Sequence, residues 1–503
     1  MSIFNSIVRI YLKRYQKTVS NIRFKSLFLQ ERELVKILRS PLYRNISKDA
    51  FFDCPPTTYD SYQKHIDTRM FSGGGKFKSI SAFAKSAGTS GATSKYIPTS
   101  KAYLKRNHIA AGWLTMHLMY AVRPDMDIIS NKNLLVGGAV YEEKSDYTVA
   151  DISGLLIRKI PKVFHPFYVP SIAEATMPDW EAKLKITSEK ASKTEKVVMI
   201  AGVPTWILTL SKEILKLSSK KSLTEVWPNL KVYLHGGVKM EPYHQQFSQL
   251  IPKQSRVLFM EVYNASEGFF AVQDTLVNEG MLLLTCHGIY YEFIKMTDYR
   301  AGVNKIFSLK DVECSEEYVI LITNMSGLCR YIIGDTVSFT SKNPFRIVVK
   351  GRISEYINAF GEDLGLDIAN RSISEVCMKH DATIRNYTVA PKYISIQEKG
   401  YHQWYVEFEK EPRDLISFTR DLDVNIQQKN FNYFQKRSDD LALKELEVVS
   451  LPKGFYDAFA KSQKKYGGQN KLPKLKNDRS LADQIEKALA MFLKTSEHQL
   501  YEF

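Results

Sequence analysis

The chain has 503 residues, of which 44% are hydrophobic and 25% are charged. This balance is typical of folded globular proteins and excludes disordered, collagen-like and coiled-coil classes. The formal charge is +16, with +8 in residues 1–50 and +6 in residues 461–479. Such ends attract an anionic partner, which could be nucleic acid, an anionic membrane surface or a phosphate-bearing ligand, although two solvated basic segments account for the charge as simply.

The apolar runs and the cysteines indicate the cellular compartment in which the protein is expected. The longest apolar run, Val197–Leu210, has 14 residues and is interrupted by Gly202 and Pro204, whereas a membrane-spanning helix needs about 20. Basic residues spread through positions 1–19 argue against a signal peptide. The five cysteines form no CxxC pair, so we expect neither a zinc site nor a disulfide framework, and a reducing, cytoplasmic location.

The N-terminal segment predicts a basic, amphipathic helix. Apolar residues recur at helical spacing between positions 7 and 22, namely Val8, Leu12, Tyr15, Val19 and Ile22. A helix that packs this stripe on the protein body is the favoured interpretation. A helix lying on a membrane is the alternative, and it makes peripheral membrane contact through residues 1–50 a hypothesis.

Strands and helices alternate from residue 77 onward. We predict strands at Phe77–Lys85, Tyr96–Ile97, Val197–Ala201, Lys231–Leu234, Val257–Tyr263 and Met281–Thr285. A helix capped by Thr99 or Ser100 continues through Leu118. This alternation favours an α/β fold with mixed sheets, at least one largely parallel, and flanking helices in a large N-terminal domain, residues 1–350.

The pattern changes near residue 350. Strands are predicted at Ile384–Ala390, Tyr393–Gln397, Gln403–Glu409 and Leu446–Ser450, and helices at Asp414–Lys436 and Phe455–Lys465. Trp404, Val406 and Phe408 share one face of their strand. These elements indicate a separate small α+β domain over residues 351–503.

A donor-rich loop follows the first predicted strand. Residues 86–95 read Ser-Ala-Gly-Thr-Ser-Gly-Ala-Thr-Ser-Lys. Hydroxyl and backbone N–H groups in such loops surround phosphate oxygens. The spacing of a Walker loop is absent, however, and a plain polar surface loop remains equally open.

Two further motifs place an acid beside a predicted strand. Ser266 and Glu267 lie in Tyr263–Gly268, where Glu267 is a candidate Mg²⁺ ligand. A helix start capped by Ser266 is the alternative. Asp335 follows Gly334 and is suited to accept hydrogen bonds from ribose hydroxyls, or to cap a turn.

Two weaker motifs lie at and beyond the domain boundary. Arg352, in Lys350–Glu362, is a candidate nucleotide contact at a pivot. Gly467–Pro473 is a glycine-hinged loop carrying Lys471, which either reaches a phosphate or belongs to a solvated basic tail.

In this order, the motifs resemble those of the adenylate-forming superfamily of acyl-CoA ligases and luciferases. The chain is most similar to bacterial members of the auxin-responsive-promoter family of acyl acid amido synthetases, over roughly residues 75–490. Besides the motifs above, the resemblance rests on Gly202–Trp206, Tyr290–Phe293, Gly327–Val337 and Ile357–Leu364. The chain departs from the superfamily pattern at Ala87, where a second serine is frequent, and at Ser94, where proline is frequent.

The resemblance implies a role for each matching residue. Ser86, Thr89 and Ser90 match the phosphate loop, and Ser266 is assigned to nucleotide binding with them. Glu267 matches the carboxylate that helps to hold Mg²⁺, and Asp335 matches the ribose-binding aspartate. Arg352 matches the hinge arginine, and Lys471 matches the mobile catalytic lysine. Val203 and Trp206 match the acyl pocket, although core packing explains Trp206 as well.

The implied function is an ATP-dependent ligase that activates a carboxylic acid as acyl-AMP and transfers the acyl group to an amine, usually an amino acid. A thiol acceptor such as coenzyme A is the alternative within the same fold. A non-catalytic basic protein at an anionic surface is the alternative outside it. Nucleic acid is not an expected partner, because no known reading motif appears and the basic run at 461–479 carries a single aromatic residue, Tyr466.

Overall fold

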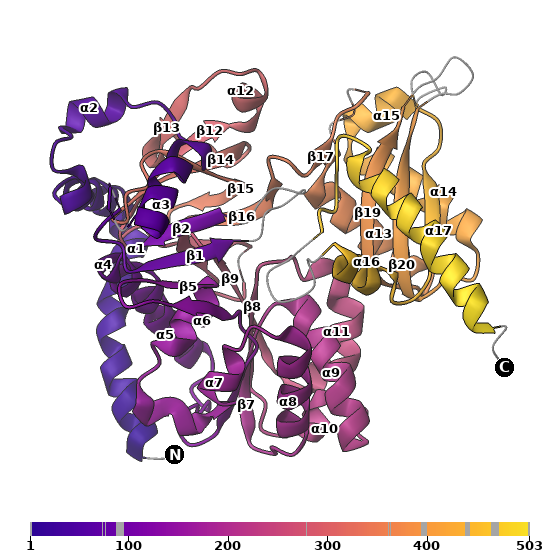
Figure 1. The fold of residues 1–503 in the computed structure, drawn as a ribbon, viewed down its shortest axis with the longest axis horizontal. Helices are drawn as coiled ribbons and strands as arrows, with labels where there is room; N and C mark the ends of the chain where they lie inside the picture. The colour runs from indigo at the N-terminus through magenta and orange to yellow at the C-terminus, as the bar shows by residue number, and fades with distance from the viewer. Residues whose placement is uncertain are drawn as a thin grey trace. The chain divides into compact units, whose positions relative to one another are not determined.

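The computed structural model describes ten stretches of the chain, namely residues 3–72, 74–75, 77–86, 95–277, 279–360, 362, 364–393, 400–437, 443–463 and 472–500. It divides into two compact units (Figure 1). Unit 1 comprises Met1–Ala87, Thr93–Val238 and Gln249–Val349. Unit 2 comprises Gly88–Ala92, Lys239–Ser248 and Lys350–Phe503. Both combine sheets with helices, so the predicted α/β class is confirmed.

A large mixed sheet organises unit 1. Among the described residues it has twelve strands, in the order β13 (Ile306–Ser308), β12 (Ile289–Lys295), β14 (Glu317–Asn324), β15 (Tyr331–Lys342), β16 (Phe345–Arg352), β11 (Met281–Leu283), β10 (Gly268–Val272), β9 (Leu258–Ala265), β8 (Val232–Gly236), β7 (Val197–Ala201), β3 (Lys132–Leu135) and β6 (Tyr168–Val169). The pairs from β9 to β6 are parallel, whereas β9 and β10 are antiparallel. The predicted strands at 197–201, 231–234, 257–263 and 281–285 all lie in this sheet.

A second sheet of unit 1 carries the donor-rich loop. Its order is β2 (Lys95–Thr99), β1 (Ala82–Ser86), β5 (Thr148–Ala150) and β4 (Val140–Glu143). The strand predicted at Phe77–Lys85 begins later, at Ala82, because residues 77–80 form a turn in which the Ile80 N–H donates to the Phe77 carbonyl at 2.9 Å. The β1–β2 pair is antiparallel and sets Ser86 opposite Lys95.

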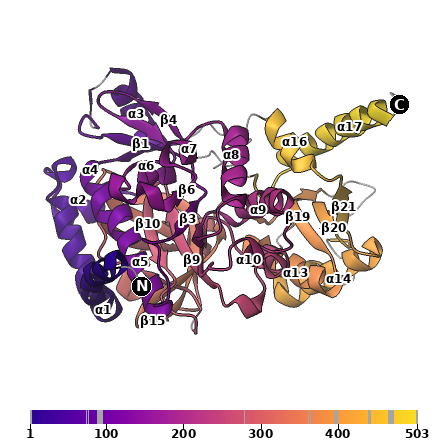
Figure 2. The same ribbon diagram turned by 90° about the horizontal axis from the view of Figure 1, so that it is seen from below.

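The first helix packs on unit 1, as predicted. Helix α1 (Ile3–Leu38) buries Leu12, Val19 and Ile22 in one apolar cluster with helix α5 (Ala110–Val122) and with strands of the large sheet (Figure 2). Non-helical backbone at Lys25 interrupts α1. No helix among the described residues is long and apolar enough to cross a bilayer.

The predicted helix after Ser100 is confirmed, but it is divided. The Ser100 hydroxyl accepts the Tyr103 N–H at 3.1 Å and caps α4 (Lys101–Leu104). A π-helical turn, η3 (Lys105–Ile109), then joins α4 to α5. The other helices of unit 1 among the described residues are η1 (Pro41–Tyr43), α2 (Lys48–Asp53), α3 (Asp60–Ser72), α6 (Ile152–Arg158), η4 (Lys162–Phe167), α7 (Ile172–Ala175), α8 (Trp180–Ser192), α9 (Pro204–Ser218), α10 (Leu223–Val226), η6 (Lys253–Ser255), α12 (Met296–Arg300) and η7 (Leu309–Asp311). Helix η5 (Glu241–Tyr243) belongs to unit 2, and α11 (His244–Leu250) begins in unit 2 and ends in unit 1.

Unit 2 is built on a three-stranded sheet, β19 (Thr383–Lys392), β20 (Tyr401–Lys410) and β21 (Glu447–Leu451), beside a short pair, β17 (Tyr356–Ile357) and β18 (Leu364–Gly365). Its helices are α13 (Leu366–Lys379), α14 (Leu415–Lys429), α15 (Phe431–Arg437), α16 (Phe455–Ser462) and α17 (Ser480–Leu500). The predicted strand at 393–397 lies, after Tyr393, outside the described residues.

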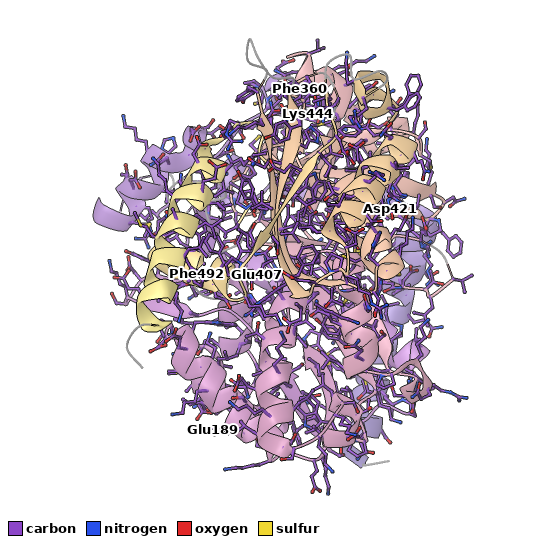
Figure 3. All side chains as sticks on the ribbon, turned by 90° about the vertical axis from the view of Figure 1, so that its right-hand side faces the viewer. Glu189, Phe360, Glu407, Asp421, Lys444 and Phe492 are labelled. Atoms are coloured by element: carbon purple, nitrogen blue, oxygen red, sulfur yellow. The ribbon has the colours of Figure 1, made fainter. Side chains whose placement is uncertain are left out.

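Alternate residues of β20 serve opposite faces of its sheet. Trp404, Val406 and Phe408 share one core with α13 and α14, as predicted, while Tyr405 faces α16 and α17. Buried Glu407 accepts the N–H groups of Gly454 and Tyr456 at the start of α16 (Figure 3).

The single helix predicted over 414–436 is instead two helices. Asn430 separates them: its side chain donates to the Glu362 carbonyl at 2.9 Å and accepts the Tyr433 N–H at 3.0 Å. Because the Asn430 side chain caps α15 in this way, α14 ends at Lys429, the residue before Asn430.

Asp367 gathers three cations in unit 2. Its carboxylate pairs with Lys239, with Lys350 at 2.8 Å and with Arg371 at 2.6 Å. Burial alone would raise the pKa of Asp367, but the charges and hydrogen bonds of Lys239 and Lys350 outweigh it and hold the pKa well below the ordinary value of 3.8.

Replacing Asp367 should destabilise unit 2. We expect Asp367→Asn to lower the free energy of unfolding by about 2 kcal/mol, because three cations lose their counter-charge. A carboxyl group whose pKa is lowered by folding stabilises the folded state at pH values above its unfolded-state pKa. This stabilisation is lost as the pH falls through the pKa of the folded state. The wild type should therefore lose stability in acid faster than the variant. Urea unfolding, with hydrogen exchange of β19 and β20 as the local readout, measures both. The exposed Asp381–Lys410 pair supplies the control Asp381→Asn, which should leave the midpoint unchanged.

Candidate active site

Ser266 and Glu267 form the turn of a β-hairpin. Ala265, the last residue of β9, pairs with Gly268, the first of β10. The alternative of a helix start capped by Ser266 is therefore wrong, because the chain reverses directly into the next strand. A Cβ on Gly268 would lie 2.7 Å from the Tyr103 hydroxyl, so only glycine lets the hairpin approach α4 this closely.

Several neighbours fix the position of this turn. The Tyr103 hydroxyl donates to the Glu267 carbonyl at 2.7 Å, and the Asn324 amide donates to the same oxygen at 3.4 Å. Both Ser266 and Glu267 are buried. A carboxylate held on a rigid turn at the end of a central strand is suited to contact a ligand with little reorganisation.

Tyr331 brings a further polar group toward Glu267. Burial raises the pKa of Tyr331 strongly, and the Glu267 charge raises it further. Its hydroxyl is buried and has no hydrogen-bond partner among the residues that the structure describes. A buried orphan hydroxyl is costly unless a ligand or water satisfies it, which suits a polar ligand beside Glu267.

Asp335 lies in a β-bulge of β15. Ile332 pairs with Leu321 and Thr336 with Val319, so residues 333–335 oppose one residue of β14. Gly334 has a φ of 96°, which an L side chain rarely adopts. The bulge orients the Asp335 carboxylate toward Tyr263, whose hydroxyl donates a hydrogen bond to it at 2.7 Å. Because Tyr263 lies on β9, the bulge and the Glu267 turn are linked through one strand.

The donor-rich loop begins at the rim of the second sheet. Ser86 ends β1, whereas Thr89 and Ser90 lie outside the described residues. On the returning strand, the Tyr96 N–H donates to the Tyr59 hydroxyl at 2.9 Å, and the Lys95 ammonium lies 5.7 Å from the Tyr59 ring centroid. These contacts fix the point at which the loop rejoins the sheet.

Val203 and Trp206 stand at the start of α9. Val203 is the residue before its first turn, and Trp206 packs against Trp180 of α8 with ring centroids 5.1 Å apart. Both side chains are half-buried. Packing against α8 accounts for Trp206 in this structure, and a partly accessible pair of indole rings also suits an apolar acid.

In unit 2, Arg352 is exposed at the end of β16. The Glu355 N–H donates to the Arg352 carbonyl at 2.9 Å, and the Glu355 carboxylate accepts the Lys474 N–H at 2.9 Å. Lys471 lies outside the described residues, which resume at Leu472. Lys474 is engaged within the unit, because its ammonium bonds to Asn386 and lies 4.8 Å from the Tyr387 ring centroid.

Sequence reasoning missed the tyrosines that orient the acids, Tyr103, Tyr263 and Tyr331. Tyr263 and Tyr331 open the very motifs that contain Glu267 and Asp335, and this adjacency is the signal that would have drawn attention to them. No group of three or more His, Cys, Asp or Glu side chains arranged for a metal occurs among the described residues.

Three family models match the chain. They describe the GH3 family N-terminal domain, over residues 24–188 and 140–256, its central domain, over residues 282–352, and its C-terminal domain, over residues 368–480. Together they include every candidate residue that the structure describes except Ser266 and Glu267.

Curated relatives are similar over shorter stretches. Indole-3-acetic acid-amido synthetase GH3.5 of Arabidopsis thaliana is 24% identical over 272 residues, 49% of this chain and 44% of that protein. Jasmonoyl–L-amino acid synthetase JAR4 of Nicotiana attenuata is 31% identical over 121 residues, 23% of this chain and 20% of that protein. The chain thus spans less than half the length of these curated relatives.

Solved structures share the fold over nearly the whole chain. The AtGH3.15 acyl acid amido synthetase in complex with 2,4-DB has a TM-score of 0.76 at 17% identity, covering 95% of this chain and 96% of that one. A 2-hydroxyisobutyryl-CoA ligase in the postadenylation state has a TM-score of 0.56 at 11% identity, covering 91% and 90%. At these identities the likeness establishes the fold.

The bulge at Gly334 generates a prediction about stability. A Cβ at Gly334 or at Gly112 of α5 would meet no atom within 4 Å, so the two sites differ in backbone conformation and not in space. We expect Gly334→Ala to destabilise the protein by about 1–2 kcal/mol and Gly112→Ala to stabilise it by about 0.5–1 kcal/mol, because alanine favours a helix interior. Urea midpoints measure both. Equal effects of the two substitutions would contradict the proposed strain.

Proposed function

The chain belongs to the GH3 family, which confirms the expected resemblance, and we propose that it is an AMP-forming ligase that joins a carboxylic acid to an amine. The observation that carries the proposal is the link from the Glu267 turn through Tyr263 of β9 to the Asp335 bulge. It sets two acids beside one strand in a fold that adenylate-forming ligases share.

The proposed reaction has two steps. A carboxylate oxygen of the acid attacks the α-phosphorus of ATP, and pyrophosphate leaves with the electrons of the broken P–O bond. The amine nitrogen then attacks the acyl carbonyl, AMP leaves, and the nitrogen loses a proton. Charge grows on the α-phosphate in the first step, so fixed donors around it lower the barrier.

The proposed roles follow the family motifs, together with the contacts of the described side chains. Asp335 is proposed to accept ribose hydroxyls, with Tyr263 holding its carboxylate in place. The loop that begins at Ser86, with Thr89 and Ser90, is proposed to donate to phosphate oxygens. Ser266, at the turn between β9 and β10, is proposed to contact the nucleotide. Lys471 and Arg352 are proposed to act from unit 2, with residues 1–350 binding ATP and acid and residues 351–503 serving as the lid.

Glu267 is the proposed Mg²⁺ ligand. The absence of a larger metal-binding cluster among the described residues fits a cation held mainly by phosphate oxygens and water, with one protein carboxylate. Such an ion, when bound, neutralises charge on the phosphates of ATP.

The substrates proposed are a small carboxylic acid and an amino acid. The jasmonoyl–L-amino acid synthetase among the relatives supports an amino acid as the amine, and the half-buried Trp206 and Val203 support an apolar acid. The cytoplasmic location expected from the cysteines remains a prediction.

Changing Glu267, or the tyrosine that holds Asp335, should impair adenylation. We expect Glu267→Gln to lower acid-dependent pyrophosphate release from Mg²⁺-ATP by about 10²–10³. Tyr263→Phe should raise KM for ATP by about tenfold with little change in kcat, because Asp335 loses one charge-assisted hydrogen bond. A panel of carboxylic acids, each with and without amino acids, supplies the substrates.

Tyr318→Phe is the matched control, since the Tyr318 hydroxyl accepts the Glu313 N–H at 2.9 Å, a contact that involves neither acid. It should leave pyrophosphate release and the KM for ATP unchanged.

Chromatography of the products formed with amino acids or with coenzyme A identifies the acceptor. A thioester and no amide would replace the proposal with the acyl-CoA ligase alternative, and no release with any acid alongside tight ATP binding would reject ligation for a binding role.

One observation favours peripheral membrane contact as well. Beyond its buried stripe, α1 exposes apolar side chains, with Phe24 at 76% and Phe28 at 62%, and the same helix carries the exposed basic residues Arg14 and Lys17. We propose that this face touches anionic bilayers. Deletion of residues 1–50 is unsuitable as a test, because Leu12, Val19 and Ile22 belong to the core.

Surface substitutions avoid that difficulty. We expect the wild type to sediment with phosphatidylserine vesicles more than with phosphatidylcholine vesicles, and Phe24→Ser/Phe28→Ser to lose this preference. Phe431→Ser, at an equally exposed phenylalanine (68%) of α15, should bind like the wild type. Equal sedimentation of wild type and double variant would reject contact through α1.

A further inference from the structure

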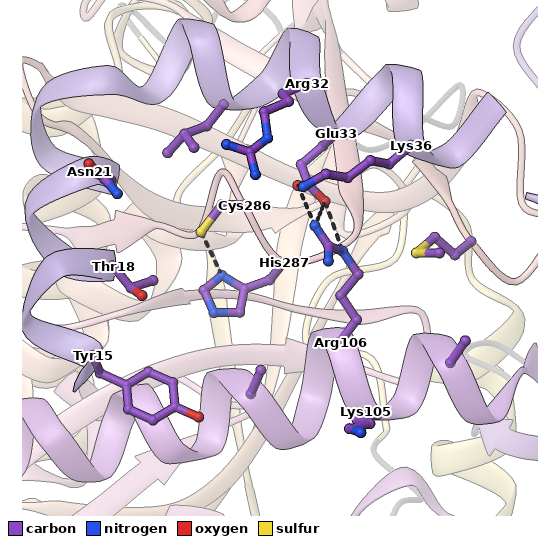
Figure 4. A pocket seen from close by; sticks show the side chains of 14 residues that line it. Tyr15, Thr18, Asn21, Arg32, Glu33, Lys36, Lys105, Arg106, Cys286 and His287 are labelled. Carbon is purple, nitrogen blue, oxygen red and sulfur yellow. Dashed lines mark hydrogen bonds and ion pairs between the residues drawn. The ribbon is translucent and has the colours of Figure 1, made fainter. Parts of the chain in front are cut away.

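A pocket of unit 1 lies outside the motifs that the proposed function uses. Its volume is about 630 Å³, within the range of small-molecule sites. Helix α1, the start of α5, the η3 turn and the segment before β12 form its walls (Figure 4). Cys286 and His287 lie on its inner wall, with the thiol 3.5 Å from the imidazole Nδ1.

Cationic side chains dominate this pocket. Its lining includes Arg32, Lys36, Lys105 and Arg106. The only carboxylate among the described lining residues, Glu33, is buried and already accepts three hydrogen bonds from Arg106, one from Lys36 at 3.0 Å and one from the Gly288 N–H at 3.0 Å. The side chains of Arg32 and Lys105, which line the pocket, have no hydrogen-bond or ion-pair partner among the described residues, so their positive charge is uncompensated.

The inner wall adds no negative charge. Burial raises the pKa of the Cys286 thiol to about 12, so the thiol stays protonated at neutral pH. Burial lowers the pKa of His287 to about 4, so the imidazole stays neutral. Leu29, Ala102 and Met325 give the rest of the lining apolar surface. The pocket therefore suits an anion of high charge that carries a short apolar group.

One element joins the pocket to the Glu267 hairpin. Lys105 and Arg106 belong to the π-helical η3, a local form that is frequent at functional sites. Asn107 of the same turn donates to the His287 carbonyl at 2.9 Å and accepts the Phe269 N–H at 2.7 Å. The wall of the pocket and the strand that follows Glu267 are thus hydrogen-bonded to a single side chain.

We infer that this pocket binds a phosphate monoester with a short apolar group, at a site separate from that of ATP. Several cations around one open cavity favour a dianionic phosphate over a carboxylate. The inference concerns binding alone and stands whether or not the chain proves to be a ligase.

Calorimetric titration of the full chain with hexyl phosphate, without Mg²⁺ or ATP, tests the inference. We expect saturable binding, weaker binding of inorganic phosphate and no binding of hexanol. Arg32→Gln/Lys105→Gln should weaken hexyl phosphate binding at least tenfold. Both side chains are exposed, so the fold should tolerate the change. The control Lys13→Gln/Lys101→Gln removes two exposed lysines of α1 and α4 outside the pocket and should bind like the wild type.

Three outcomes would overturn the inference: no heat at millimolar hexyl phosphate, equal weakening in the control, or full binding by the pocket variant. A further titration distinguishes the source of the phosphate. Competition by phosphatidic acid vesicles would identify a lipid headgroup, and competition by soluble sugar phosphates alone would identify a metabolite. Either form of competition supports the pocket as a phosphate site.

Discussion

Strand β9 pairs in parallel with β8 and antiparallel with β10, and the geometry of the candidate site depends on this double pairing. A parallel neighbour needs a long crossover, whereas an antiparallel one needs only a tight turn. The change of direction therefore places a two-residue hairpin at the end of a central strand. Glu267 occupies that hairpin, and Tyr263 reaches from the same strand to Asp335.

Part of the N-terminal positive charge stabilises the fold. Arg23 of α1 pairs with buried Asp274 at 2.7 Å, and Arg346 of β16 pairs with the same carboxylate at 2.8 Å. Buried ion pairs are costly to break, because the remaining charge is left uncompensated. They hold α1 in one register on the sheet, so the charge of residues 1–50 cannot be ascribed to a partner as a whole.

Local sequence patterns predicted individual strands and helices. They could not predict features that depend on pairing between strands far apart in the sequence. The apolar run Val197–Ala201 was predicted with the bounds of β7, since a buried parallel strand is continuous in its hydrophobicity. The order of motifs likewise predicted the family. Ser266 before Glu267 has the same local signature in a helix cap and in a hairpin, and only pairing with β10 decides between them. The bulge at Gly334 depends on register with β14, which no local window contains.

Unit 2 draws part of its structure from the middle of the sequence. Gln246 of α11 donates to the Ile384 carbonyl at 2.7 Å, and Lys239 supplies one of the cations around Asp367. A fragment that starts at Lys350 would lack both. Unit 2 therefore cannot be transferred to another protein by a single cut in the gene. An exchange of unit 2 between relatives must include the internal segment Lys239–Ser248 as well.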